Sequence, residues 1–164
     1  MKKKTIIAVV LFLSLTTIVF PKKILTSRFD LKEINIENNL LLEDKEIKKL
    51  LSRIYGKNLI FIKNEEIEKA LIQNSFIESF NIKKKYPNKL QIKIYEKKPI
   101  AILINEKNKF YLSEKIDLIE YRNLKNFQNL PNVFGNEKEF KIFYNELKNM
   151  NFPFGMIKKY TYFN

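Results

Sequence analysis

The stretch from Ser75 to Ala101 constrains the fold of this chain more than any other part of the sequence. Two segments in it alternate between apolar and polar residues, and Tyr86-Pro87-Asn88-Lys89 separates them. A period of two places alternate side chains on opposite faces of a strand, and proline favours the first central position of a β-turn. The stretch therefore predicts a β-hairpin with one lysine-bearing face and one apolar face, the latter formed by Phe80, Ile82, Leu90, Ile92 and Ile94.

Two amphipathic helices before the hairpin are expected to cover its apolar face. Asp44 is predicted to cap a helix from Lys45 to Tyr55, and Gly56 to stop it in a left-handed conformation. Asn64 is predicted to cap a second helix that runs to Gln73. Their apolar stripes are Ile47, Leu50, Leu51 and Ile54 in the first helix and Ile67, Ala70 and Leu71 in the second.

A strand predicted from Asp30 to Glu37 completes the first unit. The order β-α-α-β-β then predicts an α+β fold, with two helices on one side of a small three-stranded sheet.

The N-terminus has the pattern of a membrane anchor. Lys2, Lys3 and Lys4 precede an uncharged run from Thr5 to Phe20, and Pro21 ends it. As a helix this run would be roughly 24 Å long, and flanking lysine stems could make up the difference to the ~30 Å of bilayer hydrocarbon. Because no small-x-small cleavage site follows, the sequence favours an uncleaved signal anchor over a cleaved signal peptide. The short basic start predicts a cytoplasmic N-terminus, with the bulk of the chain outside the cytoplasmic membrane.

The composition excludes several classes of chemistry. The chain has no cysteine and no histidine, which removes thiol nucleophiles, disulfides, Cys/His zinc sites and histidine-based triads. Its carboxylates show no acid–base pairing pattern, and it has no glycine-rich loop for a phosphate. We therefore expect no enzymatic activity, no catalytic residue, no metal, no cofactor and no small-molecule substrate.

The basic side chains are densest beside the predicted turn, at Lys83, Lys84, Lys85 and Lys89, with Tyr86 among them. Lysines interleaved with aromatics are found on nucleic-acid-binding surfaces. A solvated strand face explains them as well, because lysine on an exposed strand discourages aggregation. The solvated face is the favoured interpretation, and we expect no nucleic-acid partner.

The hairpin also carries a resemblance to a known family. The sequence Lys85-Tyr86-Pro87-Asn88-Lys89-Leu90, then Ile92, Ile94 and Glu96-Lys97-Lys98-Pro99-Ile100-Ala101, resembles the FtsQ/DivIB family of bacterial division proteins, which contain a POTRA domain. Further similar elements are Ile34-Asn35-Ile36 before Asn38-Asn39, and Leu130-Pro131 with Gly135. The resemblance implies a cytoplasmic tail and transmembrane signal anchor over residues 1–28 and a POTRA-like domain over 29–99.

Residues 100–164 are expected to form part of a β-rich domain. Ile100 to Ile104 reads as a strand buried on both faces, and Glu137 to Met150 as a helix. Further strands are predicted at Phe110–Leu112, Ile116–Tyr121 and Met156–Phe163. The resemblance implies that the family's partner-binding strands follow Asn164. Whether this chain is a fragment, a frameshifted product or a reduced form of the family's protein stays open. The resemblance also implies that this chain binds its partners weakly.

The resemblance implies a non-catalytic, single-pass scaffold at the division septum, which contacts the membrane and FtsL/FtsB-like division proteins. Two alternatives stay open: a POTRA-bearing assembly or secretion component that binds extended peptides, and a membrane-tethered nucleic-acid binder. The candidate partner-binding residues are Lys83, Lys85, Tyr86, Tyr160 and Tyr162.

Overall fold

The computed structural model describes residues 3–16, 27–106 and 108–162. The elements are α1 (Lys3–Thr16), β1 (Glu33–Glu37), α3 (Asp44–Leu50), η1 (Ser52–Ile54), α4 (Asn64–Leu71), β2 (Ile77–Lys85), β3 (Lys89–Glu96), β4 (Pro99–Asn105), β5 (Asn108–Ser113), β6 (Leu118–Glu120), η2 (Lys125–Phe127), β7 (Asn132–Phe134), α5 (Glu137–Asn149), η3 (Phe154–Met156) and β8 (Lys159–Thr161). The fold is α+β, as predicted.

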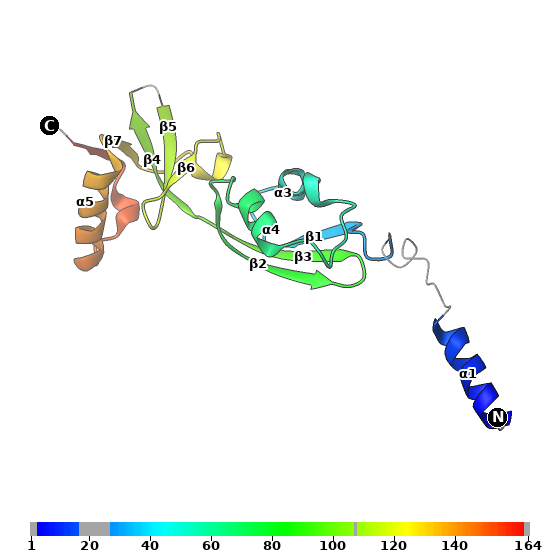
Figure 1. Cartoon of the computed structure of the whole chain (residues 1–164). Coiled ribbons are helices and arrows are strands. Elements are labelled where there is room, and N and C mark those ends of the chain that lie inside the picture. Colours follow the sequence, from blue (N-terminus) through cyan, green and yellow to red (C-terminus); the bar gives the residue numbers. More distant parts are fainter. Residues whose placement is uncertain (1–2, 17–26, 107, 163–164) are drawn as a thin grey trace.

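The predicted hairpin forms two strands of a three-stranded sheet with the order β1-β3-β2 (Figure 1). β2 is antiparallel to β3, and β1 is parallel to β3. Leu90, Ile92 and Ile94 of the central strand are fully buried. Phe80 and Ile82 face the same core but are only half-buried, because β2 lies at the edge of the sheet.

The two predicted helices cover the apolar face of this sheet, with corrections at their ends. α3 begins at Asp44, so Glu43 and not Asp44 is the N-cap residue, and no side chain caps the helix. The Asp44 carboxylate instead accepts a hydrogen bond of 3.0 Å from Asn39 Nδ2. α4 begins at Asn64 after Lys63 as N-cap, again without a side-chain cap bond.

The first helix is also shorter than predicted. α3 ends at Leu50, and the single 3-10 turn η1 continues the chain toward Gly56, whose φ of 74° is the expected left-handed stop. The second helix ends at Leu71 rather than Gln73. The predicted stripes face the core: Ile47, Leu51, Ile54, Ile67 and Leu71 are buried, and Leu50 and Ala70 are half-buried.

A second, five-stranded sheet has the order β6-β5-β4-β7-β8. In it, β7 pairs in parallel with β4 on one side and with β8 on the other. α5 packs on one face, where Phe140 and Tyr144 join Ala101, Leu103 and Val133 in a hydrophobic cluster. On β4, Ile102 belongs to the other cluster, which contains the core of the first sheet. The prediction that this strand is buried on both faces is thus confirmed. β7 was not among the predicted strands, and β8 is shorter than the strand predicted there.

Only Lys97 and Lys98 separate β3 from β4, and one hydrophobic cluster joins the two sheets. Ile102, Tyr111 and Ile119 from the second sheet lie in the same cluster as Ile92 and Ile94 of the first. The domain limits 28/29 and 99/100 stay predictions.

At the N-terminus, α1 has 14 residues. Among the residues that the structure describes, no helix has the length and apolar character needed to cross a membrane. Thr17 to Phe20 of the expected anchor lie outside the described residues.

Candidate interaction surfaces and the junction between them

Three of the five candidate partner-binding residues lie at the turn end of the hairpin. Lys83 and Lys85 are exposed on β2, one of the two edge strands of the first sheet. Tyr86 is exposed in the following turn, and its ring meets the ring of Phe29 edge-on with centroids 6.3 Å apart.

The other two residues lie in and beside β8, the last strand of the second sheet. Tyr160 is half-buried, because its ring stacks on Phe143 at 4.5 Å and contacts Phe140. Burial also raises the pKa of the Tyr160 phenol. Tyr162 is exposed, and its backbone N–H donates to the carbonyl of Phe134 at 2.9 Å.

The structure does not bring the two groups together. They belong to different sheets, and the β2–β3 turn and β8 lie toward opposite ends of the folded region (Figure 1). The candidate residues therefore form two separate surfaces, and the relation between the surfaces depends on how the sheets are joined.

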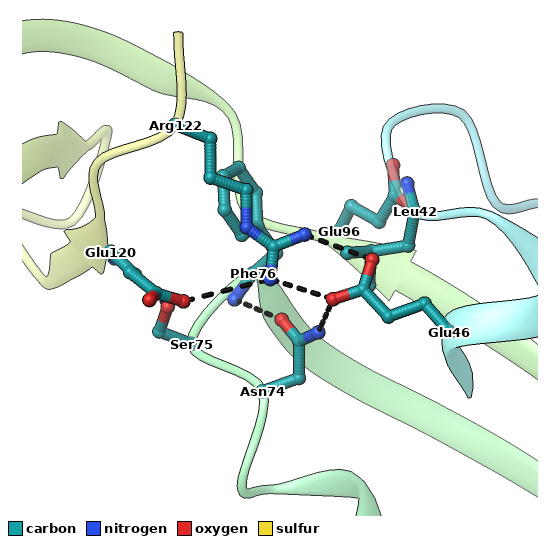
Figure 2. Close-up of polar contacts among 8 residues, drawn as sticks. All are labelled: Leu42, Glu46, Asn74, Ser75, Phe76, Glu96, Glu120 and Arg122. Carbon is teal, nitrogen blue, oxygen red and sulfur yellow. Dashed lines mark hydrogen bonds and ion pairs between the residues drawn. The ribbon is translucent and has the colours of Figure 1, made fainter. Parts of the chain in front are cut away.

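An ion pair from Arg122 to Glu46 crosses the junction of the sheets (Figure 2). Glu46 lies on α3, whereas Arg122 follows β6. Both guanidinium Nη atoms donate to the carboxylate, at 2.8 and 2.6 Å. This two-point geometry fixes orientation as well as distance, since the planar fork of arginine matches a carboxylate.

Neighbouring groups hold both members of this pair in place. Asn74 Nδ2 donates to the Glu46 carboxylate at 3.0 Å, and Asn74 Oδ1 accepts from the backbone N–H of Phe76 at 3.0 Å. The guanidinium carbon of Arg122 lies 5.1 Å from the centre of the Phe76 ring, in the range of a cation–π contact. The Tyr111 hydroxyl donates to the Arg122 carbonyl.

The electrostatics of the junction follow from these contacts. The hydrogen bond from Arg122 lowers the pKa of the Glu46 carboxyl below its ordinary value; partial burial opposes the shift, and the charge of Arg122 and the bond from Asn74 add to it. The hydrogen bond to Glu46 in turn raises the pKa of Arg122. The pair is therefore charged on both sides at neutral pH.

Glu96, at the end of β3, organises the loop between β1 and α3. Its carboxylate accepts backbone N–H groups from Leu40, Leu41 and Leu42 at 3.0, 2.7 and 2.8 Å. Asn38, with a left-handed φ of 65°, donates its side-chain amide to the Ile94 carbonyl at 2.8 Å. Asparagine tolerates this conformation better than most residues, so Asn38 suits the turn after β1.

Sequence reasoning missed the junction residues. Glu46 and Arg122 are separated by 76 positions, and no local pattern pairs them. The one available signal was a lone arginine among many lysines in the second half of the chain.

Comparisons with known proteins identify the domain formed by the first sheet and its helices. A family model described as the FtsQ-type POTRA domain matches residues 29–97. The chain is 30% identical over 108 residues to the cell division protein FtsQ of Rickettsia felis (strain ATCC VR-1525 / URRWXCal2), covering 65% of this chain and 40% of the relative. It is 28% identical over 114 residues to the cell division protein DivIB of Clostridium botulinum (strain Loch Maree / Type A3), covering 70% and 44%.

Residues 29–97 thus match the FtsQ-type POTRA domain, and the chain is similar to the FtsQ/DivIB cell division proteins.

The matched region covers less than half of the length of these curated relatives. In this chain, the region that matches the FtsQ-type domain contains Lys83, Lys85, Tyr86 and Glu46, whereas Arg122 and β8 lie beyond residue 97.

Proposed function

We propose that this chain is a member of the FtsQ/DivIB family and acts as a non-catalytic, single-pass membrane scaffold of the bacterial division machinery. Relatives named as cell division proteins support the division role. The proposed anchor is residues 5–20, with a cytoplasmic N-terminus and the folded part outside the cytoplasmic membrane at the septum. The scaffold holds FtsL/FtsB-like division proteins and helps to control septal wall synthesis.

The observation that carries this proposal is the FtsQ-type domain fixed to a second sheet whose last strand has an open side. Glu46 and Arg122 hold the two sheets in one orientation. In the part of the chain that the structure describes, β8 pairs with β7 on one side and with no strand on the other. Open strand sides bind extended segments of other chains, so this proposal departs from the weak partner binding that the resemblance implies for this chain.

The register of β8 identifies the backbone groups on its open side. Lys158 accepts from the Asn132 N–H at 3.1 Å and Tyr162 donates to Phe134 at 2.9 Å, so both point toward β7. Successive residues of a strand direct their backbone groups to opposite neighbours. Thr161 therefore presents its N–H to the open side, where a partner strand can accept it.

Co-purification with FtsL/FtsB-like proteins tests this role. Thr161→Pro removes the outward N–H while the bond from Tyr162 to β7 is kept, so capture of the partners should fall sharply. Thr161→Val changes the side chain but keeps the N–H, so its capture should match that of the unaltered chain. A circular dichroism spectrum shared by all three chains confirms that they fold alike.

Two results would contradict the proposal. Equal capture by the proline and valine variants would remove β8 from the binding surface. Absence of capture by the unaltered chain would place the partner-binding strand outside residues 27–162.

A second function, the binding of extended peptides by an assembly or secretion component, is favoured by β2. This strand has nine residues and, among the described strands, pairs only with β3. Binding of unrelated extended peptides, with no capture of division proteins, would support this second function over the scaffold.

A further inference from the structure

An exposed apolar turn lies in the connection between the two helices of the first sheet. Leu59 and Ile62 are buried, but Ile60 and Phe61 between them point outward, with 48% and 76% of their surface exposed. Two large apolar side chains in a solvent-facing turn are unfavourable unless something covers them.

This turn is held beside the hairpin turn by two sets of contacts. The Lys84 ammonium donates to the Ile62 carbonyl, which brings the end of β2 to the turn. The Leu59 N–H donates to the Phe29 carbonyl at 2.8 Å, and the Phe29 ring contacts Tyr86. Ile60, Phe61 and Tyr86 therefore belong to one end of the domain, which we call the turn surface.

The turn surface is also basic. Exposed Lys63 follows the apolar turn directly, and exposed Lys83 and Lys85 lie at the same end of the domain on the outer face of β2. The ion pairs between described residues involve none of these three lysines, whereas nearby Glu66 is already neutralised by Lys57. Exposed aromatic and aliphatic groups at the same end of a domain as such lysines match the chemistry of an anionic bilayer interface, where apolar groups enter the headgroup region and lysines meet lipid phosphates.

The start of the folded region lies at this same end. The N–H of Lys32 donates to the Asn88 carbonyl at 2.9 Å, which places the segment before β1 against the hairpin turn. With residues 5–20 in the membrane, six residues, 21–26, separate the proposed anchor from the described fold, and six residues span at most about 22 Å when fully extended. A membrane that holds residues 5–20 is therefore within reach of the turn surface.

We propose that the turn surface, formed by Ile60, Phe61, Lys63, Lys83, Lys85 and Tyr86, docks on anionic lipids of the membrane that holds the N-terminal anchor. The inference rests on the proposed membrane anchor, and it assigns a lipid surface as the partner of Lys83, Lys85 and Tyr86. Docking positions the first sheet against the bilayer and directs the second sheet, with β8, away from it (Figure 1).

A single tryptophan gives a direct test, because the chain has none of its own. The full chain carrying Phe61→Trp is reconstituted in vesicles of phosphatidylglycerol and phosphatidylethanolamine with brominated acyl chains. Its emission should shift to the blue and be quenched. Phe152→Trp, at an exposed position between α5 and η3, is the matched control and should show neither change.

Charge variants test the lipid specificity. In the Phe61→Trp background, the double variant Lys83→Gln and Lys85→Gln should lower the ratio of docked to undocked molecules. The expected loss is roughly fivefold for each lysine, since a lysine near an anionic surface contributes about 1 kcal/mol. Lys138→Gln with Lys141→Gln removes two exposed lysines from α5 and should leave the quenching unchanged.

The possible results separate the inference from the anchor. If the chain does not float with vesicles in a density gradient, the anchor and the docking inference are both wrong. If it floats but the Phe61→Trp variant is quenched no more than the Phe152→Trp variant, only the docking inference is overturned. Equal quenching in neutral phosphatidylcholine vesicles, unaltered by the Lys83 and Lys85 changes, would overturn its electrostatic basis.

Discussion

Arg122 and Glu46 lie 76 residues apart in the sequence, yet two hydrogen bonds of 2.8 and 2.6 Å join their side chains. Glu46 lies on a helix that covers the first sheet and Arg122 follows a strand of the second, so this pair joins one sheet to the other. Asn74 and Phe76 fix the pair from the side of the first sheet (Figure 2).

A double-mutant cycle with Arg122→Gln and Glu46→Gln should reveal a coupling free energy of about 1–2 kcal/mol, as expected for a two-point, partly buried ion pair. The measurement is urea denaturation in mild detergent, followed by tyrosine fluorescence. The exposed pair of Asp44 and Lys48, at 3.4 Å, is the control and should couple by less than about 0.5 kcal/mol. Similar coupling in the two pairs would mean that the junction does not depend on Arg122.

The junction should weaken in acid. Because Arg122 lowers the pKa of Glu46, this carboxyl stabilises the fold above its unfolded pKa of about 4.3, and the contribution disappears as the pH falls through the lower folded value. The stability difference between the unaltered chain and Glu46→Gln should thus be constant from pH 7 to about 5 and shrink below about pH 4. Other carboxyls titrate in both chains, so the difference isolates Glu46. A difference that is independent of pH would contradict the assigned ion pair.

Ile92→Ala should destabilise the chain by about 2–5 kcal/mol, the range for removing a large buried side chain. Ile92 is fully buried in the central strand of the first sheet. Lys93, the next residue, is exposed on the opposite face, and Lys93→Ala should cost less than about 1 kcal/mol. Denaturant midpoints of the two variants provide the comparison, and equal losses would show that the strand faces are assigned the wrong way round.

Glu96→Gln should loosen the loop between β1 and α3. The change removes the charge that three consecutive N–H groups share and should cost about 1–2 kcal/mol. Hydrogen exchange at Leu40, Leu41 and Leu42 should accelerate, while exchange in β3 stays slow. Glu43→Gln, an exposed change in the same loop, is the control. Unaltered exchange at the three leucines would show that Glu96 does not hold this loop.

Local periodicity was sufficient to predict the first sheet and its helices. Ile92 and Ile94 repeat every two residues, and Ile47, Leu51 and Ile54 repeat with the helical period. Periodicity does not fix where a helix begins, and both N-caps lie one residue before the predicted ones, at Glu43 and Lys63.

The parts that escaped prediction depend on contacts between distant residues. β7 has three residues, and its strand conformation depends on parallel pairing with β4 and β8. Arg122 has no sequence neighbour that indicates its partner. For the candidate site, the sequence identified tyrosines and lysines on two edge strands, but it did not indicate that Ile60 and Phe61 are exposed or that the two surfaces lie far apart.

The parallel pairing of β1 with β3 has a mechanical consequence. The chain enters the first sheet through the N-terminal end of β1 and leaves it toward β4 through the C-terminal end of β3 (Figure 1). Opposed pulls on these two ends act along the strands, so the hydrogen bonds from Glu33–Lys89 to Glu37–Lys93 carry the load together in shear instead of opening one at a time. Single-molecule pulling should therefore find a higher unfolding force between residues 29 and 100 than between residues 77 and 96, where the hairpin opens like a zipper. In this geometry, tension between an attachment at the N-terminus and a partner of the second sheet acts along the strands, the direction in which the first sheet resists unfolding most strongly.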